Sequence, residues 1–238
     1  MRLLLISNST NAGEEYLGHS LPKIKDFLGN FKPQNAVFIP YAAVTFSFDD
    51  YEKKVNERLA TIGLHVKSVH HYSVPAKAIE EADLIVVGGG NTFHLLKYIQ
   101  DNDLIDVVRK RVEQGTPYIG WSAGSNVACP TIKTTNDMPI IEPHSFNAFS
   151  LVPFQINPHY IDANPEGHAG ETREQRIEEF IEVNRNVYVV GLREGTALLV
   201  EDDKIRLIGE RNARIFHYGQ TPQELTPDDD FSFLYADF

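Results

Sequence analysis

A serine lies between two glycines in Gly120-Trp121-Ser122-Ala123-Gly124, directly after the apolar residues 117–119. This pattern is typical of the strand-to-helix turn that exposes a catalytic nucleophile at the end of a strand. The backbone doubles back closely at such a turn, and flanking glycines leave room for it. Five residues also match by chance in loops, so the neighbouring motifs decide between a catalytic and a structural turn.

A serine nucleophile needs a base within hydrogen-bond reach, and histidine is the usual one. We expect His159 to be this base, because it follows a short apolar run in the proline-rich region after Ser122. Loops near strand ends are where catalytic groups gather. His144 and His168 are weaker candidates. Four further histidines are expected to be ordinary surface or core residues: His65, His70, His71 and His217.

The carboxylate that orients the base has two candidates, Asp137 and Glu194. Asp137 gives the chain order serine, acid, histidine that is known from α/β hydrolases. Glu194 follows a predicted strand, at the kind of sheet edge where catalytic groups lie. The sequence leaves both open.

The run Gly88-Gly89-Gly90-Asn91 follows a buried strand and opens a helix, so its backbone amides can converge on an anion. A dinucleotide-binding fingerprint would require a third spaced glycine where Phe93 stands. A tight structural turn is the plain alternative. We favour an oxyanion hole that pairs the amide of Gly90 with that of Ala123.

A charged helix is predicted to begin near residue 171, and Arg173 lies in its first turn. Charged helix faces are usually only solvated, but Arg173 is able to pair with a substrate carboxylate. Arg173 and Asn91, the last residue of the glycine-rich run, are the candidate substrate-binding residues.

Short apolar runs alternate with helical patterns in the first half of the chain, which predicts an α/β fold with a mainly parallel sheet flanked by helices. A C-terminal antiparallel hairpin turns at Asp202-Asp203, and residues 129–170 show no regular pattern. One domain, residues 1–238, is expected. Strands are predicted over 3–7, 36–39, 66–69, 84–87, 187–191, 197–200, 205–208 and 215–217, and helices over 16–28, 51–62, 76–82, 92–100, 103–114 and 171–183.

The composition excludes several classes of function. A formal charge of -11, from 22 Lys and Arg against 33 Asp and Glu, disfavours nucleic acid and anionic membranes as partners. Cys129 is the single cysteine and the N-terminal apolar run is short, so we expect a cytoplasmic protein. The sequence does not determine the oligomeric state, and a homo-oligomer is allowed.

Five segments together resemble dipeptidase E, the aspartyl dipeptidase family of serine peptidases: Gly88 to Phe93, Gly120 to Gly124, Thr134 to Pro139, Asn157 to His159 and Gly170 to Ile177. The resemblance covers nearly the whole chain, with the motifs in family order. It implies a fold similar to the class I glutamine amidotransferases, with serine at the turn where those enzymes carry cysteine.

The resemblance also implies a serine exopeptidase that hydrolyses dipeptides with an N-terminal aspartate. Ser122 matches the nucleophile and His159 the base, while Asp137 and Glu194 both match residues proposed as the third member. No cofactor or metal is implied. The sequence differs from the family pattern at Ser125, Arg193 and Thr196, and related cyanophycinases cut an aspartyl-arginine polymer, so the exact substrate stays open. An esterase or other acyl hydrolase, and a non-catalytic binder of an acidic metabolite, are the alternatives.

Overall fold

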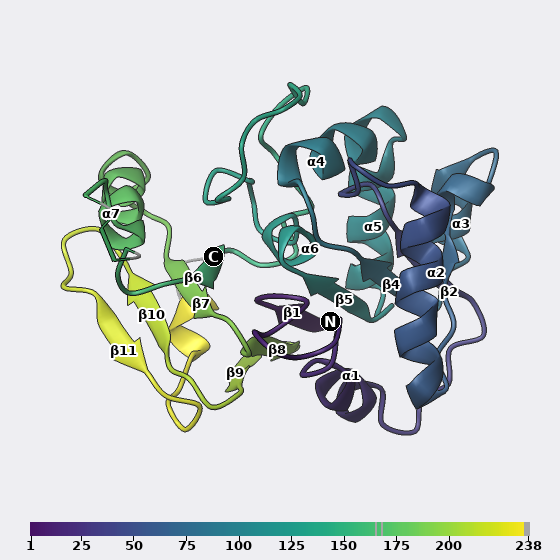
Figure 1. The fold of residues 1–238 in the computed structure, drawn as a ribbon, viewed down its shortest axis with the longest axis horizontal. Helices are drawn as coiled ribbons and strands as arrows, with labels where there is room; N and C mark the ends of the chain where they lie inside the picture. The colour runs from purple at the N-terminus through teal and green to yellow at the C-terminus, as the bar shows by residue number, and fades with distance from the viewer. Residues whose placement is uncertain (165, 168, 236–238) are drawn as a thin grey trace.

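The computed structural model describes residues 1–164, 166–167 and 169–235, and these residues form two β-sheets (Figure 1). The larger sheet contains β1 (Arg2–Ile6), β2 (Ala36–Ile39), β3 (Lys67–Ser68), β4 (Leu84–Val87), β5 (Tyr118–Trp121), β8 (Ala197–Glu201) and β9 (Lys204–Ile208). Its strand order is β3-β2-β4-β5-β1-β8-β9. The smaller sheet, ordered β11-β10-β7-β6, contains β6 (Gln155–Tyr160), β7 (Val189–Arg193), β10 (Ala213–Phe216) and β11 (Gln223–Leu225).

Five neighbouring strands of the larger sheet pair in parallel, in the order β3, β2, β4, β5 and β1. β8 pairs antiparallel to β1 and forms the hairpin with β9. The predicted α/β class, the mainly parallel sheet and the C-terminal hairpin are therefore confirmed. The carboxyl ends of β4 and β5 lie beside one another, which is where open parallel sheets place their ligands.

Helices cover both faces of the larger sheet. Alternate residues of β1 point to opposite faces, so Leu3 and Leu5 join one buried cluster while Leu4 and Ile6 join another. The first cluster includes side chains of α3 (Pro75–Glu80), α4 (Thr92–Asp101) and α5 (Leu104–Glu113). The second includes those of α1 (Leu21–Leu28) and α2 (Phe48–Leu59). Each fully buried Leu or Ile contributes about 1.5–3 kcal/mol, so this sheet is held mainly by apolar burial.

The smaller sheet lies on the opposite side of the larger sheet from α2 (Figure 1). One face of the smaller sheet packs against α7 (Arg173–Val183), which contributes Ile177 and Ile181 to the contact. Residues of its other face, among them Ile156 and Val190, belong to the same buried cluster as Leu3. The two sheets therefore share a core, which fixes their relative position.

Two predictions of secondary structure were wrong. The region 129–170 was expected to lack regular structure, but it contains β6, whose short apolar run gave too weak a signal. The helix expected from residue 16 begins only at Leu21, because Leu17 adopts a left-handed conformation with φ 58° and Pro22 lies in the first turn. None of the described helices combines the length and the apolar character that a bilayer crossing requires.

Candidate active site

Ser122 lies at a sharp turn between β5 and α6 (Ala123–Asn126), with φ 54° and ψ −113°. This is strained backbone for a residue with a side chain, as expected for a nucleophile turn. A side chain at Gly124 would place its Cβ 2.2 Å from the carbonyl oxygen of Val87. The N–H of Ser122 donates to the carbonyl of Ile6 at 3.0 Å, which anchors the turn between β4 and β1.

His159 lies on β6, at an irregularity in its pairing with β7. Pro158 pairs with Leu192 and Tyr160 with Arg193, so His159 is the additional residue of a β-bulge. Its φ is 53°, the left-handed region that few non-glycine residues adopt. Bulges redirect side chains, and this one lets Tyr160 stay buried while His159 is half exposed.

Ser122, His159 and Glu194 form a continuous chain of hydrogen bonds. Glu194 directly follows β7, and its Oε1 lies 2.7 Å from His159 Nδ1. His159 Nε2 lies 3.0 Å from Ser122 Oγ. A carboxylate only accepts hydrogen bonds, so Nδ1 carries the proton and Nε2 is free to accept the proton of the serine hydroxyl. The side chains of His159 and Glu194 are 39% and 41% exposed, so a substrate has access to the chain.

Asp137 is placed elsewhere. Its Oδ2 accepts from the backbone N–H of Thr92 at 2.7 Å, from the Thr92 hydroxyl at 2.5 Å and from the Thr135 hydroxyl at 3.2 Å. Thr92 is the first residue of α4, where backbone N–H groups lack helical partners and the helix dipole favours negative charge. The structure brings Glu194, and not Asp137, to His159.

Two residues that follow β1, Ser7 and Asn8, connect the larger sheet to the smaller sheet. The hydroxyl of Ser7 donates to the carbonyl of Leu192 at 2.7 Å and accepts from the N–H of His159 at 3.0 Å. Asn8 accepts from the N–H of Gly195, the neighbour of Glu194, at 2.8 Å. Sequence reasoning did not find these residues. Their signal is polarity directly after a buried parallel strand, where the ends of neighbouring strands converge.

The glycine-rich loop lies against the nucleophile turn. A Cβ added to Gly89 would be 3.0 Å from that of Ser122. Gly90 has φ +141°, and a Cβ there would lie 2.3 Å from the carbonyl oxygen of Ala42, so only glycine fits. Within the described residues, the N–H of Gly90 donates to no acceptor. The N–H of Ala123, at the start of α6, likewise donates to no acceptor within the described residues.

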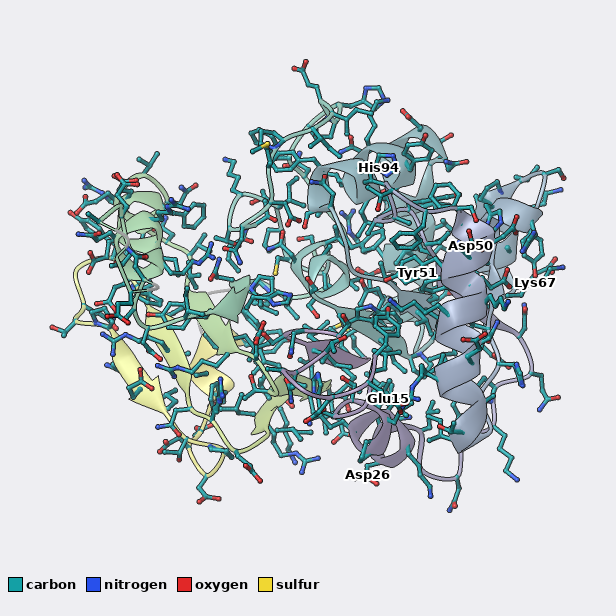
Figure 2. All side chains as sticks on the ribbon, in the orientation of Figure 1. Glu15, Asp26, Asp50, Tyr51, Lys67 and His94 are labelled. Atoms are coloured by element: carbon teal, nitrogen blue, oxygen red, sulfur yellow. The ribbon has the colours of Figure 1, made fainter. Side chains whose placement is uncertain are left out.

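Tyr51 of α2 holds this loop. Its hydroxyl donates to the carbonyl of Gly89 at 2.8 Å and lies 3.2 Å from both Trp121 Nε1 and the hydroxyl of Tyr16. Tyr51 is on the side of α2 that faces the sheet (Figure 2). Burial raises the pKa of Tyr51 to about 12, so the hydroxyl keeps its proton for Gly89. Sequence reasoning placed Tyr51 only in a helix.

Arg173 lines a pocket of about 190 Å³ beside the end of β6, together with Asn136, Asp137 and Asn157. The guanidinium donates to Asn136 Oδ1, and Asn136 Nδ2 donates at 2.6 Å to the carbonyl of Pro158, the residue before His159. Burial, with the nearby Arg176, lowers the pKa of Arg173, and the Asp137 carboxylate raises it. An arginine stays protonated at neutral pH in any case.

The other sequence candidates make no hydrogen bond to Ser122, His159 or Glu194 within the described residues. Asn91 caps α4 by accepting from the N–H of His94 at 3.0 Å, and its Nδ2 donates to the carbonyl of Met138 at 2.8 Å. His144 pairs with Asp101 on the surface, and His168 lies outside the described residues. Cys129 is buried, and burial raises the pKa of its thiol to about 12.

Comparison with known proteins identifies the family. The sequence model of Peptidase family S51 matches residues 3–208. Peptidase E of Nostoc sp. is 53% identical over 233 residues, covering 98% of this chain and 96% of that protein. Peptidase E of Salmonella typhimurium is 49% identical over 220 residues, covering 92% and 95%.

Solved structures agree on the fold. The crystal structure of a peptidase from an acI-B1 Actinobacterium has a TM-score of 0.68 at 19% identity, covering 98% of this chain and 96% of that one. A putative Peptidase E protein from Listeria monocytogenes EGD-e has a TM-score of 0.62 at 24% identity, covering 87% and 98%. The chain belongs to peptidase family S51, a family of peptide-bond hydrolases.

Proposed function

We propose that this chain is a serine exopeptidase that hydrolyses dipeptides with an N-terminal aspartate, through a triad of Ser122, His159 and Glu194. The observation that carries this proposal is the hydrogen-bond chain from Ser122 Oγ through both ring nitrogens of His159 to Glu194. A serine without such a base is a poor nucleophile at neutral pH. The names of the relatives, Peptidase E, agree with the reaction class.

In the proposed reaction, Ser122 Oγ attacks the carbonyl carbon of the peptide bond while its proton passes to His159 Nε2. Glu194 stabilises the imidazolium that forms. The N–H groups of Gly90 and Ala123 donate to the oxyanion. His159 then protonates the leaving amine, the peptide C–N bond breaks, and an aspartyl ester of Ser122 remains. Water, activated by His159, hydrolyses this ester and restores the serine.

Arg173 is proposed to bind the side-chain carboxylate of the N-terminal aspartate. Three cationic residues line its pocket, Lys133, Arg173 and Arg176, against the single carboxylate of Asp137. Arg173 uses one guanidinium nitrogen for Asn136, which leaves further N–H donors for a bidentate contact. In this proposal Asn91 contributes by holding the loop that carries Met138 and by capping α4.

The two sheets are proposed to act as one peptidase domain, residues 1–238. Ser122 comes from the larger sheet, whereas His159 and Glu194 come from the smaller one. Neither sheet has a complete triad alone. A cytoplasmic location is proposed on the sequence argument of a single cysteine.

Hydrolysis of Asp-Leu, Glu-Leu and Leu-Leu by the purified protein, with a chelator present, tests the proposal. We expect cleavage of Asp-Leu alone, and a loss of about 10⁴-fold or more in Ser122→Ala with an unchanged melting temperature. An active Ser122→Ala variant would exclude the serine mechanism. Turnover of short esters without any peptide would favour an acyl hydrolase, and saturable binding of aspartate without turnover would favour a binding protein.

A further inference from the structure

Four potential metal ligands converge at the start of α2, on elements that contribute no member of the triad. Asp49 and Glu52 lie one turn apart on α2, and His70 and His71 follow in the short 3₁₀ helix Val69–His71. One ligand atom from each residue lies within 4.8 Å of the others. Figure 2 labels Asp50, the sequence neighbour of Asp49, at the upper end of α2.

The spacing of the ligand atoms suits a small divalent cation. Asp49 Oδ1 lies 2.9 Å from His70 Nε2 and 3.6 Å from His71 Nε2, and Glu52 Oε2 lies 2.5 Å from His71 Nε2. A tetrahedral zinc ion with bonds of about 2.1 Å holds its ligand atoms about 3.4 Å apart. The observed distances lie on both sides of this value, and the shortest, 2.5 Å, differs from it by about 0.9 Å, which rotations of the side chains are able to supply.

Atoms of His70 and Glu52 that do not face the other ligands are held by contacts with neighbouring residues. His70 Nδ1 lies 2.6 Å from the hydroxyl of Ser68, which fixes the ring and leaves Nε2 free of the proton when a metal binds. The backbone N–H of Ser68 donates at 3.0 Å to Glu52 Oε1, the oxygen that does not face His71. The ring of Phe48 packs against that of His70, with centroids 5.6 Å apart. Such contacts reduce the entropy that metal binding costs.

Exposure and charge allow an ion to enter. The side chains of Glu52 and His70 are 16% and 19% exposed, and those of His71 and Asp49 are 36% and 74% exposed. The formal charge of the chain, -11, favours cations near the surface. Two imidazoles with two carboxylates select zinc or a similar transition metal over magnesium and calcium, which prefer oxygen ligands alone.

We propose that Asp49, Glu52, His70 and His71 form a binding site for Zn²⁺ that joins α2 to the segment after β3. The metal ion takes the place of the hydrogen bonds that now join the imidazole rings to the carboxylates. The site is separate from the triad, so it needs no part in peptide hydrolysis, and the proposal is independent of the proposed function. His70 and His71 were expected to be ordinary surface or core residues.

Titration of chelator-treated protein with Co²⁺ tests the site, because tetrahedral cobalt absorbs visible light. We expect one equivalent to bind with this absorption and zinc to displace it. At a hundredfold excess of zinc over its dissociation constant, the melting temperature should rise by about 5–10 °C. The double variant His70→Gln/His71→Gln should lose the absorption and the temperature shift.

Two further variants separate this site from other effects. Glu52→Gln keeps an oxygen for the Ser68 N–H but removes the charge, and should weaken cobalt binding at least tenfold. His144→Gln removes a surface histidine that pairs with one carboxylate, Asp101, and should leave cobalt binding unchanged. Without metal, each variant should have the melting temperature of the metal-free wild-type protein. Unchanged cobalt affinity in the double variant, or no saturable binding by the wild-type protein, would overturn the proposal.

Discussion

The two sheets contribute to the candidate site in different ways. The larger sheet positions Ser122 through local backbone geometry, with a strand, a tight turn and glycines that admit close contacts. Its strands β1, β4 and β5 are almost completely buried among apolar side chains. The smaller sheet positions His159 and Glu194 through a bulge and through hydrogen bonds to residues far away in the sequence.

Charge also distinguishes the sheets. Arg193, at the end of β7, donates to Asp162 and Glu224, and Arg214 of β10 pairs with Glu174 of α7. These ion pairs are partly exposed, so each contributes little by itself, but together they join β7, β10, β11 and α7. The position of Ser122 therefore depends on apolar packing, whereas those of His159 and Glu194 depend also on polar contacts that mutations and pH are able to remove.

The largest expected effect separates the two candidate acids. Glu194→Gln should lower kcat by about 10³–10⁴-fold, because the neutral amide no longer holds His159 in the required tautomer. Asp137→Asn should destabilise the protein by about 1 kcal/mol through the start of α4 and should lower kcat far less. Steady-state kinetics on Asp-Leu and denaturant unfolding of both variants measure this. The reverse order of the two kcat losses would assign Asp137 to the triad.

The next effect concerns substrate charge. Arg173→Ala should lower kcat/KM for Asp-Leu by about 10–150-fold, the range for a hydrogen bond to a charged group. Asn-Leu has the same shape without the charge, so its hydrolysis should change little. Arg176→Ala provides the control, since that side chain lines the same pocket but is more exposed. Equal losses on Asp-Leu and Asn-Leu would mean that Arg173 only supports the fold.

The contact between the sheets is tested by Ser7→Ala. The variant leaves the carbonyl of Leu192 and the N–H of His159 without their partner, so the free energy of unfolding should fall by about 1–3 kcal/mol. We also expect a lower kcat, because His159 loses its backbone anchor. Ser9→Ala is the matched control, since the Ser9 hydroxyl makes no hydrogen bond within the described residues. Equal behaviour of the two variants would contradict the bridging role.

The smallest effect is the response of the smaller sheet to acid. Hydrogen bonds from Arg193 lower the pKa of Asp162. Burial raises the pKa of Glu224, but the hydrogen bonds and charges of Arg193 and Arg214 together lower it below its ordinary value. Groups with depressed pKa values in the folded state stabilise it above their unfolded pKa, and this contribution is lost as pH falls through the folded values. Local stability of the smaller sheet should therefore decrease below about pH 4.

Hydrogen exchange of the two sheets, corrected for the intrinsic rate at each pH, measures how much protection each sheet loses as the pH falls. Arg193→Met should remove most of the acid-dependent loss in the smaller sheet, because the carboxylates of Asp162 and Glu224 then lose their partner in the folded state. Arg206→Met is the control, since Arg206 pairs with Glu201 on the hairpin of the larger sheet. Protection that falls equally in both sheets would show that the ion pairs have no local effect.

The sequence by itself predicted the features that depend on neighbouring residues. Alternating apolar runs indicated the α/β class, and Gly120 to Gly124 indicated the turn that holds Ser122, because glycines at a strand end report a local backbone requirement. The run Gly88 to Gly90 indicated a second tight turn, between a strand and a helix, for the same reason. Strand β6 was missed, since an apolar run of two or three residues among prolines gives no clear period.

Only the tertiary structure decided which distant side chains meet. The sequence held Asp137 and Glu194 as equal candidates, and the structure places Glu194 at His159 and Asp137 at the start of α4. Ser7 contacts His159 across 152 positions of the chain. Such contacts arise because strands from separate parts of the chain end at one edge of the fold, and no residue pattern within one segment records that meeting.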